Sequence, residues 1–187
     1  FSFIILAVLI GVVVVAGLVL SKSDLSKKIP HSVTVNQPGY YSINHFVDGD
    51  TIAVNMDGQV ETVRMIVIDT PETHKPNTPV QCYGEDAAAY TKHLIGDNNV
   101  RLQADPTNTN RDRYGRLLRY VYLPDGRMVE TELIKNGYAF SYTQFPFEKT
   151  NEFNQLELQA KNSGAGLWSK CSIVVEGNGR EQTQYKQ

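Results

Sequence analysis

An apolar segment that contains one arginine and leads directly into a polar turn constrains this chain more than any other feature. Residues 64–72 read Arg-Met-Ile-Val-Ile-Asp-Thr-Pro-Glu. Apolar and β-branched side chains at successive positions of Arg64–Ile68 favour a strand that is buried on both faces. Pro71 has no N–H for a β-ladder, so the strand must end before it. The segment therefore predicts a rigid strand that presents Asp69 and Glu72 at its end, where a functional site is well supported.

Arg64 begins this segment and lies between Val63 and Met65, in surroundings that otherwise resemble a core. A guanidinium there requires an anionic partner, because an unpaired buried charge costs several kcal/mol. The partner is either a protein carboxylate or the phosphate of a ligand. The segment alone leaves both interpretations open.

A two-residue turn signal, Asp57-Gly58, predicts a β-hairpin in the first half of the chain. Strand-like residues 40–47 and 51–56 precede this turn, and Asp48-Gly49-Asp50 separates them. The Arg64 segment follows the turn. The first half of the chain is therefore expected to be β-structure.

The hairpin also predicts which residues lie opposite one another. With this turn as the loop, Asp50 falls opposite Met65 and therefore beside Arg64 across the ladder. Asp69 follows along the same edge, with Glu72 just beyond it. A β-bulge would shift this register by one residue. The turn thus predicts that three carboxylates and one arginine gather at one place.

Three helices and two further strands are expected in the remaining chain. Acidic residues in the first turn and basic residues in the last turn of the first helix suit the helix dipole. Thr150 is the expected N-cap of the third helix, and Gly164 lies past its end. This order predicts an α+β fold with a small antiparallel barrel. The expected helices are 84–95, 129–135 and 151–162, and the expected strands are 100–104 and 117–123.

Residues 1–20 are apolar and carry no charge. Twenty such residues in a helix span about 30 Å, the thickness of a bilayer core. We expect a transmembrane helix, with a cleaved signal segment as the alternative. The chain opens on Phe1 rather than Met, so we expect residues to precede it. Residues 21–32 are interpreted as a linker, 33–176 as the folded domain and 177–187 as a disordered tail.

Cys82 and Cys171 are the two cysteines of the chain. An even number of cysteines, both of which follow a membrane segment, favours a disulfide formed in an oxidising compartment. Two reduced, buried thiols are the alternative. The lysines that follow residue 20 favour a cytoplasmic side for the domain, whereas a disulfide favours the opposite side. We expect a domain outside the cytoplasm, anchored in the membrane or secreted if residues 1–20 are removed.

Residues 110–116, Asn-Arg-Asp-Arg-Tyr-Gly-Arg, form a second segment with functional chemistry. Arginine binds phosphate through two parallel hydrogen bonds, and tyrosine stacks on bases. A solvated charged turn is the alternative. The carboxylates near Arg64 are hard oxygen ligands that suit Ca²⁺ or Mg²⁺, and the four histidines show no zinc spacing.

These segments resemble the motifs of the staphylococcal nuclease (thermonuclease) family, in order and with near-constant spacing. The resemblance implies a five-stranded OB-type β-barrel with three helices. It also implies calcium-dependent cleavage of DNA and RNA that leaves 3′-phosphate ends. The matching segments are Val47-Asp-Gly-Asp-Thr51, Arg64–Glu72, Asp112-Arg-Tyr-Gly-Arg116, Lys135-Asn-Gly-Tyr-Ala139 and Gly166-Leu-Trp-Ser169.

The resemblance implies a metal site and a catalytic base. Asp50 and Asp69 would hold Ca²⁺ through their carboxylates, and Thr70 through its backbone carbonyl. Glu72 would orient or deprotonate the attacking water. A carboxylate base suits this role, because water is a poor nucleophile at neutral pH.

The resemblance also implies the residues that bind substrate. Arg64 and Arg116 would hold the scissile phosphate. Arg113, Tyr114 and Tyr142 would contact substrate phosphate or the terminal nucleotide. Arg113 stands where the best-known member of the family has lysine, so the charge is kept while the hydrogen-bond geometry differs.

The expected partners are single-stranded DNA and RNA, duplex DNA, and a membrane through residues 1–20, with the protein a monomer. The net charge of −2 predicts weak, salt-sensitive binding to nucleic acid. A non-catalytic nuclease-fold binding module is the alternative, and loss of Arg64, Glu72 or Arg116 would be its mark. All three are present. A membrane-tethered, calcium-stabilised adhesion domain would leave both arginines unexplained.

Overall fold

The computed structural model describes residues 34, 38–73 and 79–186 of the chain. It divides the chain into Phe1–Ser32 and Val33–Gln187, and the elements below belong to the second unit. The expected transmembrane or signal segment 1–20 and the linker 21–32 lie outside the described residues. Within the described ranges, no helix has the length and apolar character needed to span a bilayer.

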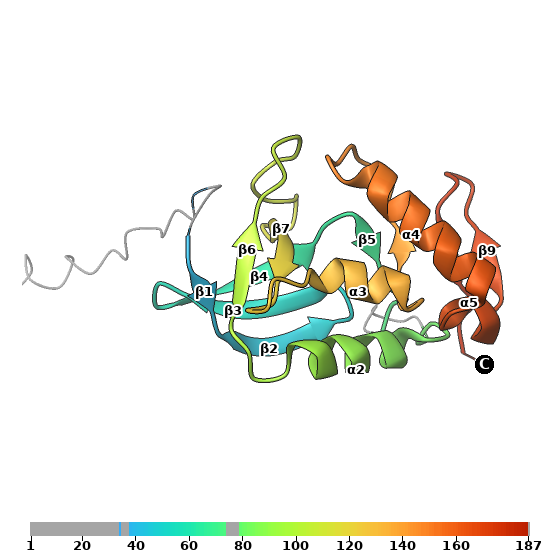
Figure 1. Cartoon of the computed structure of the whole chain (residues 1–187), viewed down its shortest axis with the longest axis horizontal. Coiled ribbons are helices and arrows are strands. Elements are labelled where there is room, and N and C mark those ends of the chain that lie inside the picture. Colours follow the sequence, from blue (N-terminus) through green and yellow to red (C-terminus); the bar gives the residue numbers. More distant parts are fainter. Residues whose placement is uncertain (1–33, 35–37, 74–78, 187) are drawn as a thin grey trace, which may run out of the picture. The chain divides into compact units, whose positions relative to one another are not determined.

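A curled, six-stranded sheet forms the centre of the domain, in the order β1-β6-β7-β4-β3-β2 (Figure 1). Strands β1 and β2 are the two edges of this order, yet only Ser42 separates them in the chain. The sheet therefore curls until both edges belong to one bent segment. This is the α+β, OB-type architecture that the sequence predicts, but the sheet has six strands rather than the expected five, because the break at Ser42 divides one bent segment into β1 and β2. The strands are β1 (Tyr40–Tyr41), β2 (Ile43–Asp48), β3 (Thr51–Met56), β4 (Gln59–Met65), β6 (Val100–Gln103) and β7 (Leu117–Tyr122).

The expectation of a wholly antiparallel barrel is wrong at one strand pair. Strand β4 pairs with β7 in parallel, with Val63 opposite Leu117, while the other pairs of this sheet are antiparallel. Helix α2 (Gly84–Ile95) and strand β6 lie between β4 and β7 in the chain. A connection of that length lets the chain return in the same direction.

The predicted register of the hairpin is confirmed. Met56 pairs with Gln59, and Thr51 lies opposite Arg64. The Met65 N–H donates to the Asp50 carbonyl at 2.8 Å. Residues 57 and 58 have φ values of 49° and 79°, as a tight two-residue hairpin turn requires. The turn thus places Asp50 beside Arg64.

The segment Arg64–Ile68 is not the single strand expected from its sequence. Strand β4 ends at Met65, and β5 (Ile68–Asp69) pairs with β8 (Phe140–Ser141) in a separate sheet. Val67 has a φ of 66°, in the left-handed region, where the chain turns between the strands. Residues 65–68 are all buried. A buried segment is apolar whether its backbone is straight or bent, so the apolar residues alone do not reveal the bend.

The three predicted helices are α2 (Gly84–Ile95), α3 (Val129–Lys135) and α4 (Thr150–Ser163), and the one-turn helix α5 (Leu167–Lys170) follows them. Helix α3 contacts α2, α4 and β7. Thr150 is the first residue of α4 rather than its N-cap, which is Lys149. The Thr150 hydroxyl donates to the Phe147 carbonyl at 2.8 Å, so it closes the preceding turn instead.

The expectation of a disordered tail at residues 177–187 is wrong for 177–186. Strands β9 (Ile173–Val175) and β10 (Glu181–Thr183) form an antiparallel hairpin. Tyr185 then forms a β-bridge with Gln81. Most side chains of this hairpin are exposed or half-buried, and backbone pairing stabilises it. Its sequence therefore lacks the apolar pattern that marks a core strand.

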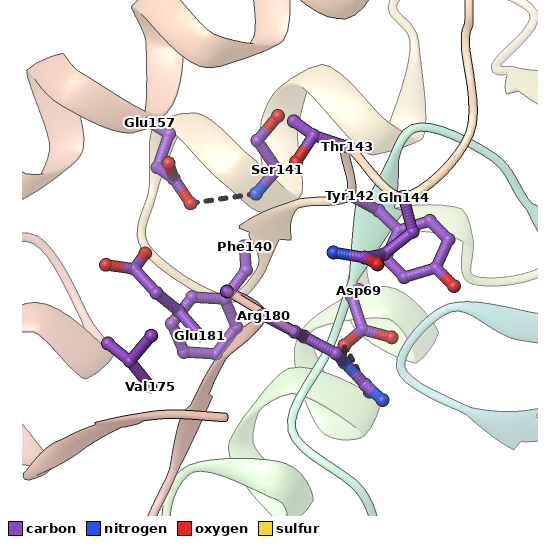
Figure 2. Close-up of a pocket in the computed structure, with 11 residues that line it drawn as sticks. Asp69, Phe140, Ser141, Tyr142, Thr143, Gln144, Glu157, Val175, Arg180 and Glu181 are labelled. Atoms are coloured by element: carbon purple, nitrogen blue, oxygen red, sulfur yellow. Dashed lines mark hydrogen bonds and ion pairs between the residues drawn. The ribbon is translucent and has the colours of Figure 1, made fainter. Parts of the chain in front are cut away.

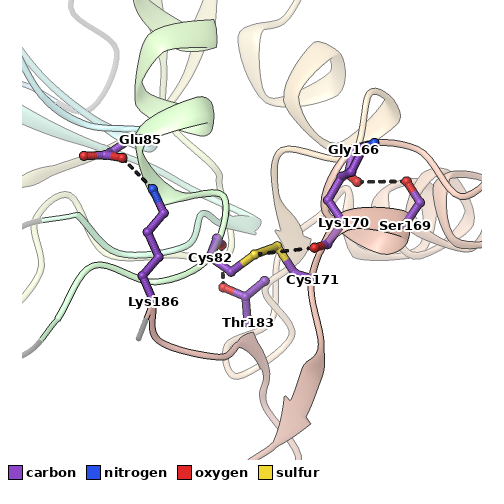
Figure 3. Close-up of a disulfide and its surroundings, with 8 residues drawn as sticks. All are labelled: Cys82, Glu85, Gly166, Ser169, Lys170, Cys171, Thr183 and Lys186. Atoms are coloured by element: carbon purple, nitrogen blue, oxygen red, sulfur yellow. Dashed lines mark hydrogen bonds and ion pairs between the residues drawn. A yellow bond between two sulfur atoms is a disulfide. The ribbon is translucent and has the colours of Figure 1, made fainter.

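Cys82 and Cys171 form a disulfide with their Cα atoms 5.9 Å apart (Figure 3). The bridge joins the segment that follows Glu72 to the start of the C-terminal hairpin. Backbone and side-chain bonds reinforce it. The Cys82 N–H donates to the Gln184 carbonyl at 2.7 Å, and the Thr183 hydroxyl donates to the Cys82 carbonyl at 2.7 Å.

Candidate active site

One cleft of about 810 Å³ is lined by all nine residues predicted to bind metal, bind substrate or catalyse. They come from the turn before β3, from β4, from the segment at β5 and beyond, from the loop before β7 and from the residue after β8. The curled sheet thus brings segments that are far apart in the chain to one cleft. The nine residues are Asp50, Arg64, Asp69, Thr70, Glu72, Arg113, Tyr114, Arg116 and Tyr142.

Arg64 lines the cleft and has two carboxylate partners. Its Nη2 atom is 3.1 Å from Asp50 Oδ2 and 3.0 Å from Asp69 Oδ1. Its Nη1 atom donates to the carbonyls of Met65 and Ile68, so the guanidinium spans the bend between β4 and β5. Burial by itself lowers the pKa of Arg64, but the charges of Asp50 and Asp69 outweigh it and raise that pKa above the ordinary value. Arg64 is therefore a fixed, permanent cation.

Asp50 and Asp69 are held by different sets of donors. Asp50 accepts hydrogen bonds from the Thr51 hydroxyl at 2.9 Å and the Thr70 N–H at 3.0 Å. Asp69 Oδ2 accepts from Nε of Arg180 at 3.0 Å and from its Nη2 at 2.5 Å. Burial raises the pKa of the Asp69 carboxyl, and the charge of Asp50 adds to this, against the opposing effects of Arg64 and Arg180.

The oxygen atoms around Arg64 fit a hard cation. Within the described part of the chain, no three His, Cys, Asp or Glu side chains gather into a metal site. Two carboxylates do meet at Arg64, and beside them the Thr70 hydroxyl is buried without a hydrogen-bond partner. A buried, unpaired hydroxyl calls for a ligand or water. Carboxylates, carbonyls and water are the ligands that Ca²⁺ takes, so Asp50, Asp69 and Thr70 could hold this ion.

Glu72 is positioned by a residue that the sequence did not single out. Gln81 Oε1 accepts the Glu72 N–H at 2.7 Å, and the Gln81 N–H donates to the Glu72 carbonyl at 3.0 Å. Gly84 permits this close packing, since a Cβ there would lie 2.8 Å from the Glu72 carbonyl oxygen. Gln81 is buried and carries no local motif, so only the folded chain identifies its role.

The loop before β7 forms the basic wall of the cleft. Asp112 shapes this loop, because its Oδ1 accepts the N–H groups of Tyr114 and Arg116 while its Oδ2 accepts Nε of Arg116 at 2.7 Å. These bonds lower the pKa of Asp112 although partial burial opposes them. Tyr114 is 69% exposed, and the Arg113 guanidinium lies 4.8 Å from the centre of its ring. An exposed ring flanked by arginines can stack on a base.

Arg180 lines the cleft, but the sequence did not identify it, because it lies in the segment expected to be disordered. It follows the turn between β9 and β10 and points to Asp69 (Figure 2). Arg180, Asp69 and Tyr142 also line a smaller cavity of about 230 Å³. These three residues therefore separate the cleft from the smaller cavity.

The fold and the cleft define a class: an OB-type α+β domain with one cleft that is lined by paired carboxylates and by several arginines. Residues 62–170, more than half of the chain, match a family model described as "Staphylococcal nuclease homologue". The chain therefore belongs to the staphylococcal nuclease family.

Named relatives agree with this placement. The chain is 41% identical over 148 residues to endonuclease YncB of Bacillus subtilis (strain 168), a match that covers 78% of this chain and 69% of the relative. It is 42% identical over 130 residues to the thermonuclease of Staphylococcus hyicus, which covers 69% of this chain and 75% of the relative. The SPbeta prophage-derived endonuclease YokF of Bacillus subtilis (strain 168) is 44% identical over 137 residues, or 72% of this chain. That match spans only 46% of YokF.

Proposed function

We propose that this protein is a calcium-dependent endonuclease that hydrolyses phosphodiester bonds of DNA and RNA and leaves 3′-phosphate ends. The observation that carries the proposal is one cleft that is lined both by a half-buried arginine paired with two carboxylates and by a basic, aromatic loop. The names of three relatives, two endonucleases and a thermonuclease, support it.

Arg64 and Arg116 are proposed to bind the scissile phosphate. Negative charge on the phosphate oxygens grows as the attacking water adds, and preorganised cations stabilise that charge best. Arg64 meets this requirement because Asp50, Asp69 and two backbone carbonyls hold it in place. Arg116, which lines the same cleft, is held by Asp112. Both guanidinium groups are thus held by carboxylates in the cleft where a phosphate would bind.

Glu72 is proposed to activate the attacking water. A positioned carboxylate accelerates such a step by accepting a proton from the nucleophile. Two hydrogen bonds with Gln81 hold the Glu72 backbone and so fix the position of the Glu72 Cα atom, from which the carboxylate side chain extends. Glu72 then needs to be ionised and within hydrogen-bond reach of the water.

Asp50, Asp69 and the Thr70 carbonyl are proposed to hold the Ca²⁺ ion. When bound there, the ion would neutralise charge on the phosphate and orient it. The unpaired Thr70 hydroxyl and the two convergent carboxylates favour a cation at this position.

Arg113, Tyr114 and Tyr142 are proposed to bind the chain of the substrate on either side of the cleaved bond. The exposed Tyr114 ring suits the stacking of an unpaired base, so single-stranded DNA and RNA are the expected substrates, with duplex DNA also cleaved. The protein is proposed to act as a monomer.

The domain is proposed to work outside the cytoplasm, anchored in the membrane by residues 1–20 or secreted if these residues are removed. The disulfide between Cys82 and Cys171 supports this, since such bonds persist in oxidising compartments.

Digestion of single-stranded DNA by the 187-residue chain tests the proposal. Cleavage in Ca²⁺ is expected to stop in EGTA and in the variants Arg64→Ala and Arg116→Gln, while Arg127→Gln, which lies outside the cleft, should retain it. Arg116→Gln is included because it leaves Asp50 and Asp69 paired with Arg64. Cleavage that survives EGTA would refute the role of the metal. Binding of DNA without cleavage by the folded wild-type chain would instead indicate a non-catalytic binding module.

A further inference from the structure

The contact between Arg180 and Asp69 joins residues that are 111 positions apart in the chain. The backbone of Arg180 is held in its turn, because its carbonyl accepts the Glu176 N–H at 2.8 Å and its N–H donates to Asn178 Oδ1 at 3.0 Å. From this position the guanidinium makes two hydrogen bonds to a single oxygen of Asp69. The contact is therefore a specific one.

Asp69 is surrounded by positive charge on both of its oxygens. Oδ1 binds Arg64 and Oδ2 binds Arg180. A divalent cation that binds Asp69 would lie within a few ångströms of both guanidinium groups, where like charges repel strongly. Withdrawal of one of the two arginines would therefore strengthen metal binding.

The surroundings of the two arginines indicate which of them withdraws. The Arg64 side chain is 14% exposed, and it also bonds to Asp50 and to the carbonyls of Met65 and Ile68. The Arg180 side chain is 37% exposed and comes from a surface hairpin. Moving Arg180 breaks fewer buried contacts and returns its charge to solvent.

We propose that Arg180 is an active-site residue that sets the affinity for the metal: it holds Asp69 as an internal counter-ion, and the bound cation displaces it. This inference rests on the proposed cation site at Asp50 and Asp69. The displaced side chain remains in the cleft, because Arg180 already lines it.

The hairpin stays in place while the side chain moves. Its base is joined to the segment after Glu72 by the disulfide and by a hydrogen bond of 2.9 Å from Gln81 Nε2 to Gln182 Oε1. The motion required is a change of rotamer at Arg180, so the site exchanges one cation for another without unfolding the C-terminal strands.

Calorimetric titration of the 187-residue chain with CaCl₂, in the absence of nucleic acid, tests the inference. If Arg180 covers Asp69 for nine-tenths of the time, the apparent Kd for Ca²⁺ is raised about tenfold. Arg180→Gln is therefore expected to lower the Kd about tenfold, and Arg180→Lys, which keeps the charge but loses the paired hydrogen bonds, by less. Arg127→Gln removes an exposed arginine–carboxylate pair outside both cavities and should leave the Kd unchanged.

Thermal melting of the same variants provides a second readout that a merely structural role would not produce. Because the Arg180–Asp69 contact exists only in the metal-free form, Arg180→Gln should lower the Tm in EGTA and should lower it much less in saturating Ca²⁺. An equal loss of Tm in both conditions, together with an unchanged or higher Kd, would overturn the inference and leave the metal site standing. Failure of the wild type and of every variant to bind Ca²⁺, Asp50→Asn included, would overturn the metal site and the inference together.

Discussion

Gln81 connects the backbone of the proposed catalytic residue Glu72 to the C-terminal hairpin. Its replacement should lower both the stability of the domain and kcat, and a matched control distinguishes the two effects. Its side chain is buried, with Oε1 accepting the Glu72 N–H at 2.7 Å and Nε2 donating to Gln182 Oε1 at 2.9 Å. Gln81→Ala leaves both of these partners without their hydrogen bond.

The expected loss of stability follows from these two bonds. Leaving a partly buried donor and acceptor unpaired costs about 2 kcal/mol in total. For a domain of this size, that corresponds to a fall in Tm of roughly 4–8 °C. The Glu72 backbone is then held by fewer contacts, and a misplacement of about 1 Å can cost up to about 100-fold in rate. We expect kcat to fall about 10- to 100-fold with little change in KM.

Gln182→Ala is the matched control, because it removes the bond to the hairpin and keeps the bond to Glu72. Stability should fall by about 1 kcal/mol, and kcat should fall far less than in Gln81→Ala. Melting by circular dichroism and initial rates on a labelled oligonucleotide measure both effects. A normal kcat in Gln81→Ala, or an equal loss of kcat in both variants, would refute the positioning role of Gln81.

Three further predictions concern separate parts of the domain. Glu72→Gln should reduce turnover by orders of magnitude with an unchanged circular dichroism spectrum, and normal turnover would remove Glu72 from the base role. Burial raises the pKa of Glu130 well above its ordinary value although the Val121 N–H donates to it. The native carboxyl thus holds its proton more tightly than the unfolded chain does, so Glu130 costs stability as the pH rises above the unfolded pKa. Glu130→Gln should therefore increase the free energy of unfolding at neutral pH, with no gain below about pH 4, and a gain that is constant with pH in urea melts would contradict this. The Cys82–Cys171 bridge closes a loop of 89 residues, so its reduction should lower the free energy of unfolding by about 4–5 kcal/mol. Non-reducing mass spectrometry that finds the two cysteine peptides unlinked would show that the disulfide is absent.

The amino-acid sequence by itself determined the elements whose cause is local. The Asp57-Gly58 turn sets the pairing of every residue that follows it in the hairpin, so the position of Asp50 beside Arg64 follows from local sequence alone. The positions of the three longer helices are set by the spacing of their own apolar residues and by the residues next to their ends. Their bounds agree with the prediction to within about one residue. The sequence motifs also singled out the nine residues that are proposed to act in the cleft.

Only the tertiary structure decided the features that depend on distant partners. A buried apolar run has the same composition in a strand and in a bend, so the left-handed turn at Val67 could not be read from residues 64–68. The polar C-terminal segment is ordered by backbone pairing and by its link to Cys82, and these contacts leave no apolar pattern in the sequence. Arg180 enters the cleft for the same reason: its contact with Asp69 is made across 111 residues by a hairpin that exists only once the rest of the domain has folded. Local chemistry therefore identifies which residues could form the site, and the folded chain decides which other charges share it.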